Sequence, residues 1–110
     1  MVIYNVTANV DERIHQIWLE WMEKIHIPEV LETGKFNKAL LTRVLVEEEM
    51  GGITYSIQYL AKSKEDLDAY YAVDASTLRK KVFDKFGDAV VAFRTELQII
   101  NEFQVDTTEK

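Results

Sequence analysis

The chain contains no cysteine among its 110 residues, which excludes disulfide bonds, a thiolate nucleophile and a zinc-finger site. It also lacks a glycine-rich dinucleotide or phosphate loop, so the sequence predicts no cofactor. No apolar run approaches the length of a membrane span, and Met1 leads directly into a predicted strand rather than into a signal peptide. We therefore expect a cytoplasmic protein that does not enter a membrane.

Basic residues are scarce relative to acidic ones, with 13 Lys and Arg against 19 Asp and Glu and a formal net charge of −6. An acidic surface argues against nucleic acid and against anionic membranes as primary partners, because both are themselves negatively charged. One hydrophobic pattern runs through the chain, which predicts a single domain over residues 1–104. Residues 105–110 are polar and are expected to form a frayed tail.

The clearest secondary-structure signal lies in residues 40–61. They are rich in β-branched and aromatic side chains and predict two paired strands. Gly51 and Gly52 supply the positive φ angles of a tight turn between them. Alternation divides the side chains of a strand between two faces. One face is apolar and is expected to pack against helices, whereas the other is mixed and is expected to carry Leu41 and Leu45.

Further strands and two helices flank this hairpin. Residues 2–10 alternate as a strand, and Asp11 then has the chemistry of a helix N-cap. The following helix carries an apolar stripe that includes Ile17 and Ile25. We expect Pro28 to end this helix and to begin a separate short helical turn, because the residue before a proline avoids the helical region.

A second helix is predicted after the hairpin. Ser63 with Asp66 resembles a capping box at its start, and Gly87 is expected to end it. A break at residues 74–76 is compatible with its pattern. The last strand is expected to span roughly residues 89–103.

The order strand, helix, strand, strand, helix, strand predicts an α+β fold of the ferredoxin-like βαββαβ class. Right-handed crossovers then place both helices on one face of a four-stranded antiparallel sheet and leave the other face bare. The bare face would expose apolar side chains, among them Ile3 and Leu60. A second copy packed sheet to sheet would cover them, so we expect a homodimer.

Five stretches carry a resemblance that spans nearly the whole chain: IYNVT, WLEWM, HIPEVLETGKF, RVLVEEEMGGITYSIQY and FGDAVVAFRTEL. With them the chain resembles a bacterial family of domains of unknown function. That family resembles the dimeric α/β-barrel superfamily, in which two ferredoxin-like subunits pack their sheets together. Relatives there include cofactor-free monooxygenases, haem-degrading enzymes and small-molecule-binding proteins. The resemblance thus implies a fold and an assembly, but no catalytic residue.

Polar side chains on the predicted bare face are the first candidates for a binding site. Buried polar groups without partners are costly, so they are usually paired or serve a ligand, and two arginines could hold an anion. Glu47 and Glu96 are expected nearby. The alternative is that these groups only hydrogen-bond across a wet dimer interface. The candidates are Asn5, Thr7, Arg43, Ser56, Gln58 and Arg94.

His26 is the second candidate, because it follows the first helix and lies close to Glu29 in sequence. A histidine there could act as a catalytic acid or base near neutral pH. The alternative is a histidine that caps the helix C-terminus or is exposed to solvent.

The run of Glu47, Glu48 and Glu49 invites a metal-binding hypothesis, but alternation places Glu48 on the opposite face from the other two. No histidine has suitable spacing, so we predict no metal site.

The leading functional hypothesis is a homodimer that binds a small organic or anionic molecule beside the bare sheet face, with or without cofactor-independent catalysis. The alternative is a structural or protein-interaction module without a small-molecule ligand. A titration of His26 near neutral pH, with loss of turnover on its removal, would distinguish an enzyme from such a module.

Overall fold

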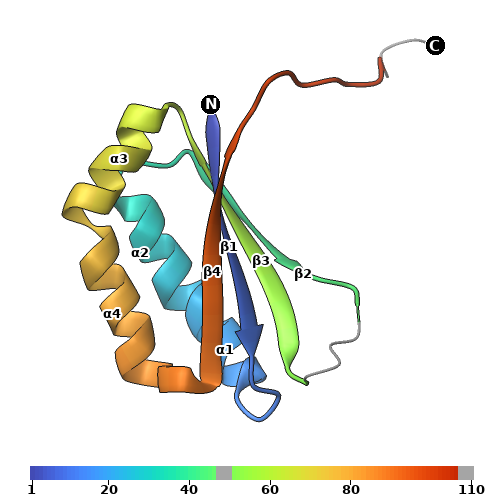
Figure 1. Ribbon diagram of the computed structural model, residues 1–110, viewed down its shortest axis with the longest axis vertical. Coiled ribbons are helices and arrows are strands. Elements are labelled where there is room, and N and C mark those ends of the chain that lie inside the picture. Colours follow the sequence, from blue (N-terminus) through green and yellow to red (C-terminus); the bar gives the residue numbers. More distant parts are fainter. Residues whose placement is uncertain (47–50, 107–110) are drawn as a thin grey trace.

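The computed structural model describes residues 1–46 and 51–106, and the glutamate run at residues 47–49 lies outside them. Four strands and a series of helical segments follow one another along the chain (Figure 1). The strands are β1 (Val2–Val10), β2 (Lys38–Arg43), β3 (Ile53–Ala61) and β4 (Val90–Gln98). The helical segments are α1 (His15–Trp21), the π-helical η1 (Met22–His26), α2 (Ile27–Glu32), α3 (Lys64–Val73), α4 (Ala75–Phe86) and the 3₁₀ turn η2 (Gly87–Ala89).

The strands form one antiparallel sheet in the order β2-β3-β1-β4. All the helices lie on one side of it, and the opposite side carries no helix (Figure 1). The predicted ferredoxin-like fold is therefore confirmed. Apolar residues from the helix-facing side of the sheet and from the helices form one core. Its buried members are Val2, Tyr4, Ala8, Val10, Trp18, Met22, Val30, Phe36, Tyr55, Ile57, Tyr59, Ala61, Leu67, Tyr70, Ala75 and Leu78.

Pro28 does not end the first helix, contrary to the prediction. The backbone stays helical from α1 through η1 into α2, and the N–H of Ile27 donates to the carbonyl of Met22, five residues earlier. A wider π turn before a proline accommodates the missing N–H and the bulk of its ring. The apolar stripe expected for a straight helix is also wrong in part, since Ile17 and Ile25 are exposed.

The first helix begins later than Asp11, so the predicted N-cap is also wrong. The Asp11 carboxylate accepts a hydrogen bond from the backbone N–H of Arg13 at 2.8 Å, and it organises a turn that precedes α1. The helix itself starts at His15 without a side-chain cap. Short acidic side chains favour such local turns as readily as helix caps.

The second helical region follows the sequence more closely. The Ser63 hydroxyl accepts from the backbone N–H of Asp66 at 3.2 Å, which confirms this cap. Asp74 interrupts the helix with a φ of −115° and separates α3 from α4. Gly87 ends α4 with a positive φ of 58°, as glycine does most easily.

In both edge strands, β2 and β4, the two alternating sets of side chains lie on the opposite faces of the sheet from those predicted. Leu41 of β2 pairs with Ile57 and packs against the core, so the prediction that it lies on the bare face is wrong. In β4, Val91 and Phe93 lie on the bare face, since Phe93 pairs with Thr7. Apolar residues occupy both alternating sets of these strands, so the pattern alone does not fix their register.

The last strand is shorter than predicted. Its pairing with β1 ends at Gln98, after which the N–H of Ile99 donates to the carbonyl of Met1 at 3.0 Å. Residues 100–106 then leave the sheet as an extended segment (Figure 1). Their side chains Ile100, Phe103 and Val105 are exposed.

Gly52 is expected to be more sensitive to substitution than Gly34, although both have a φ of +79°. Each alanine variant pays the strain of a left-handed conformation, about 1 kcal/mol. A Cβ on Gly52 would also lie 2.5 Å from Oδ1 of Asn9, whereas one on Gly34 meets nothing within 4 Å. Urea unfolding should therefore show a clearly larger loss of stability for Gly52→Ala than for Gly34→Ala. Equal losses would mean that the close approach to Asn9 does not change the free energy of unfolding.

Candidate functional site

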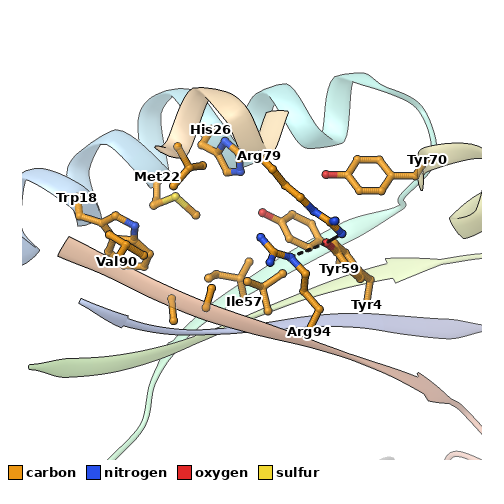
Figure 2. Close-up of a pocket in the computed structure, with 14 residues that line it drawn as sticks. Tyr4, Trp18, Met22, His26, Ile57, Tyr59, Tyr70, Arg79, Val90 and Arg94 are labelled. Carbon is orange, nitrogen blue, oxygen red and sulfur yellow. Dashed lines mark hydrogen bonds between the residues drawn. The ribbon is translucent and has the colours of Figure 1, made fainter. Parts of the chain in front are cut away.

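A cavity of about 50 Å³ lies between the helix-facing side of the sheet and the helices (Figure 2). This volume is enough for a few water molecules, and therefore for a small polar group of a ligand. The apolar side chains gather at one end of the cavity and the polar ones at the other (Figure 2). Its lining consists of Tyr4, Val6, Ala8, Trp18, Met22, His26, Ile57, Tyr59, Tyr70, Arg79, Val82, Val90, Ala92 and Arg94.

Two arginines converge on one tyrosine at the polar end. Nη2 of Arg79 donates to the Tyr4 hydroxyl at 2.9 Å, and Nε of Arg94 donates to the same oxygen at 3.2 Å. Arg79 comes from α4 and Arg94 from β4, so the two guanidinium groups reach Tyr4 from opposite layers of the fold (Figure 2). The buried Nε of Arg79 has no hydrogen-bond partner in the described chain.

The nearest carboxylate on the same strand face is already engaged elsewhere. Glu96 pairs with Tyr4 across the strands, but its side chain accepts from the Tyr71 hydroxyl at 2.6 Å and lies 3.2 Å from Nζ of Lys64. Within residues 1–46 and 51–106, neither Arg79 nor Arg94 forms an ion pair with a carboxylate. The polar end of the cavity is therefore positively charged.

Two further tyrosines, Tyr59 from β3 and Tyr70 from α3, face the same space. Both rings are buried, and burial raises the pKa of each phenol above its ordinary value, so both hydroxyl groups stay protonated. A protonated phenol can donate a hydrogen bond to a ligand. The polar end is thus rich in donors.

His26 lines the upper side of the cavity and stacks on Trp21 with 5.2 Å between ring centroids. It is only 8% exposed, so the alternative of a solvent-exposed histidine is wrong. Burial lowers the pKa of His26 to about 4; Glu29 opposes this shift, while Lys81 and Arg94 add to it. The ring is therefore neutral at pH 7, and a catalytic role for His26 stays a prediction. Its Nδ1 has no partner in the described chain.

Four of the predicted binding residues, Asn5, Thr7, Ser56 and Gln58, do share the helix-free face. The Ser56 hydroxyl donates to Oδ1 of Asn5 at 2.6 Å, and the Asn5 amide donates to the Thr7 hydroxyl at 3.1 Å. Asn5, Thr7 and Ser56 therefore supply hydrogen-bond partners to one another, whereas Gln58 takes no part in these two bonds. A role for them in ligand binding stays a prediction.

Arg43 and Arg94 do not lie on that face, so this part of the predicted site is wrong. Arg43 pairs with Tyr55 and Arg94 with Val6, and both partners face the helices. The cause is the exchange of faces in the edge strands described above. Arg94 nevertheless lines a cavity on the other side of the sheet. His26, the one predicted catalytic residue, lines the same cavity.

Arg79 and Tyr70 were not among the predicted site residues. Arg79 precedes Lys80 and Lys81, and such a charged run is typical of a solvated helix face. A signal was present in the spacing, since Arg79 lies four residues after Ala75 and three before Val82, both on the predicted buried stripe.

Large apolar side chains remain exposed on the helix-free face. Leu40 of β2 and Val91, Phe93 and Leu97 of β4 all belong to this set. They flank the polar centre formed by Asn5 and its neighbours, because β2 and β4 are the two edge strands. The face thus has a polar centre between two apolar borders.

The described residues contain neither a group of metal ligands nor a helix that could span a membrane. No three His, Asp or Glu side chains in residues 1–46 and 51–106 come together as metal ligands would. The helices in these ranges are too short or too polar to cross a bilayer.

The model of one protein family, described as "Domain of unknown function (DUF4286)", matches residues 1–100. No curated protein matches the chain. Two solved structures from an uncultured marine organism, each described as a dimeric ferredoxin-like protein, are 17% and 14% identical with TM-scores of 0.70 and 0.72. They cover 93% and 96% of this chain and 97% and 100% of their own. A protein of the ethyl tert-butyl ether (EthD) family from Bacillus halodurans is 14% identical, with a TM-score of 0.64 over 86% of this chain and 97% of its own.

His26 should make the protein less stable in acid. Its pKa is lowered from 6.5 to about 4 in the folded chain, so the unfolded chain binds more protons between these values and stability falls as the pH drops through this window. Relative to pH 7, the loss at pH 4.5 should be about 2 kcal/mol. Urea unfolding of His26→Gln should lack this part of the pH dependence, and His15→Gln should keep it. An unchanged pH profile in His26→Gln would contradict the buried neutral state.

Proposed function

The chain belongs to the DUF4286 family, and we propose that it is a homodimer that binds a small organic molecule in the cavity of each protomer. The cavity, rather than the helix-free face, is the proposed ligand site. A cavity with one apolar end and a few converging polar groups at the other is the usual form of a small-molecule site.

The lining supports a ligand with two chemically different ends. Trp18, Met22 and Val90 form the apolar end, and Tyr4, with the guanidinium groups that reach it, marks the polar end (Figure 2). Nδ1 of His26 adds an unpartnered polar atom between them. Buried polar atoms without partners are costly, and a bound molecule would satisfy this one. A small molecule with a short apolar body and a polar head therefore suits the cavity.

The helix-free face supports the homodimer. Its apolar borders include Val91 and Phe93, and leaving them in water would be unfavourable. A second copy presents the same arrangement, so a two-fold axis would bring border to border and polar centre to polar centre. The description of two structural relatives as dimeric agrees with this assembly.

The C-terminal segment adds to the same argument. Ile100, Phe103 and Val105 are exposed, and the segment leaves its own sheet instead of folding back over it (Figure 1). A groove of about 260 Å³ lies at that end of the helix-free face between Leu40 and Leu60 of the sheet and Asn101 and Glu102 at the start of the segment, and it offers apolar surface. We propose that the segment of one protomer packs on the other protomer.

Phe93→Glu should dissociate the dimer, because it places a charge inside the proposed interface. Phe83→Glu is the matched control, since Phe83 is 66% exposed on α4 and Phe93 is 63% exposed on the helix-free face. Light scattering should give twice the 12.8 kDa of one chain for the wild type and for Phe83→Glu, and 12.8 kDa for Phe93→Glu. A wild type that is monomeric at all concentrations would overturn the homodimer.

Ala92→Phe should abolish ligand binding, because Ala92 lines the apolar end and a phenyl ring there would fill it. The measurement is the melting temperature with a panel of small neutral and acidic organic molecules, since a ligand that binds the folded state raises it. Ala72→Phe, on an exposed position of α3, is the control and should respond like the wild type. If molecules that stabilise the wild type stabilise Ala92→Phe equally, they bind outside this cavity.

A further inference from the structure

We propose that the ligand of this cavity is an organic oxyanion, such as a small carboxylate, held between Arg79 and Arg94. This inference rests on the proposed function, because it assigns a chemical class to the molecule that the cavity binds. Four independent features of the lining point to it.

The first feature is positive charge that no carboxylate of the described chain balances, although Arg94 is exposed to solvent and the Arg79 guanidinium lies 5.7 Å from the centroid of the Tyr71 ring. The Tyr4 hydroxyl oxygen accepts from both guanidinium groups, at 2.9 and 3.2 Å, but it is neutral and cannot balance two cations. Neither arginine pairs with a carboxylate in the described part of the chain, and Glu96 is held by Tyr71 and Lys64. An anion placed beside both guanidinium groups would supply the missing negative charge.

The second feature is the balance of donors and acceptors. The lining contains no Asp, Glu, Asn, Gln, Ser or Thr side chain. Two donors to Tyr4 occupy the lone pairs of its hydroxyl, so its proton remains to be donated. The hydroxyl groups of Tyr59 and Tyr70 lie in the same region and have no acceptor among the described residues. A ligand for such a site must offer acceptors, and a carboxylate offers about four lone-pair positions.

The third feature is the geometry of the arginines. A guanidinium group presents parallel N–H bonds that match the two oxygens of a carboxylate. Nε of Arg79 is buried without a partner, while Nη2 of the same group is used by Tyr4. A carboxylate oxygen could take the free Nε–H without displacing the bond to Tyr4.

The fourth feature is the neutral environment around the charged end. His26 is more than nine-tenths buried and its Nδ1 has no partner in residues 1–46 and 51–106, so it can add one hydrogen bond to the ligand. Trp18 and Met22 then leave room only for an apolar body beyond the head. The inferred ligand is thus a small monocarboxylate with a short aliphatic group, rather than a sugar, in keeping with the cavity volume of about 50 Å³.

Matched pairs of an acid and its amide test this inference, because the amide keeps the shape and loses the charge. We would measure acetate against acetamide, propionate against propionamide and butyrate against butyramide by isothermal titration calorimetry at pH 7 and constant ionic strength. At least one acid should bind the wild type about tenfold or more tightly than its amide. Arg79→Gln and Arg94→Gln should reduce this ratio to near one.

Arg43→Gln is the matched control, since it removes the same charge from an exposed position that does not line the cavity, and it should keep the ratio. Arg94→Lys retains the charge without the paired N–H bonds and should give an intermediate ratio, which separates a charge effect from a folding defect. Equal binding of an acid and its amide would overturn the oxyanion and leave the proposed cavity site standing. Absence of binding by every acid and every amide would overturn both.

Discussion

Tyr4 lies in a central strand with four aromatic rings around it, and its hydroxyl has to find hydrogen-bond partners within that apolar surrounding. The rings of Phe36, Tyr59, Tyr70 and Tyr71 lie with their centroids 5.6–6.0 Å from that of Tyr4. A buried phenol oxygen without a partner would cost about 1–3 kcal/mol. The partners come from outside the cluster, because two arginines reach in from α4 and β4. The Tyr4 hydroxyl thus brings the half-buried Arg79 and the exposed Arg94 to the same point at the edge of the core.

The two faces of the sheet treat their polar groups differently. On the helix-free face, Asn5, Thr7 and Ser56 form hydrogen bonds with one another. Under the helices, atoms of His26 and Arg79 remain without partners in the described chain. Completed hydrogen bonds are what a stable protein interface requires, whereas incomplete ones create affinity for a molecule that completes them. The proposed interface and the proposed ligand site therefore differ in whether their polar atoms already have hydrogen-bond partners, rather than in polarity itself.

The sequence predicted correctly the faces of strands with a clear alternation of apolar and polar residues. It failed for strands in which two registers have nearly the same free energy. Central strands β1 and β3 alternate apolar and polar residues, so their faces were predicted correctly. The edge strands are apolar on both sides, and pairing with their neighbours decided their register. Arg94 was consequently assigned to the wrong face. Arg79 was missed because its charge favours a solvated position, and only the packed structure reveals that a tyrosine hydroxyl draws it inward.

The π turn before Pro28 has a consequence for the ancestry of the site. A π turn holds one residue more than an α turn between the same two points, so it is what a single-residue insertion leaves in a helix whose ends are already fixed by packing. Trp18 and Val30 are buried on either side of it and anchor those ends. Relatives that differ at this point should therefore differ by a gap in alignment rather than by a substitution.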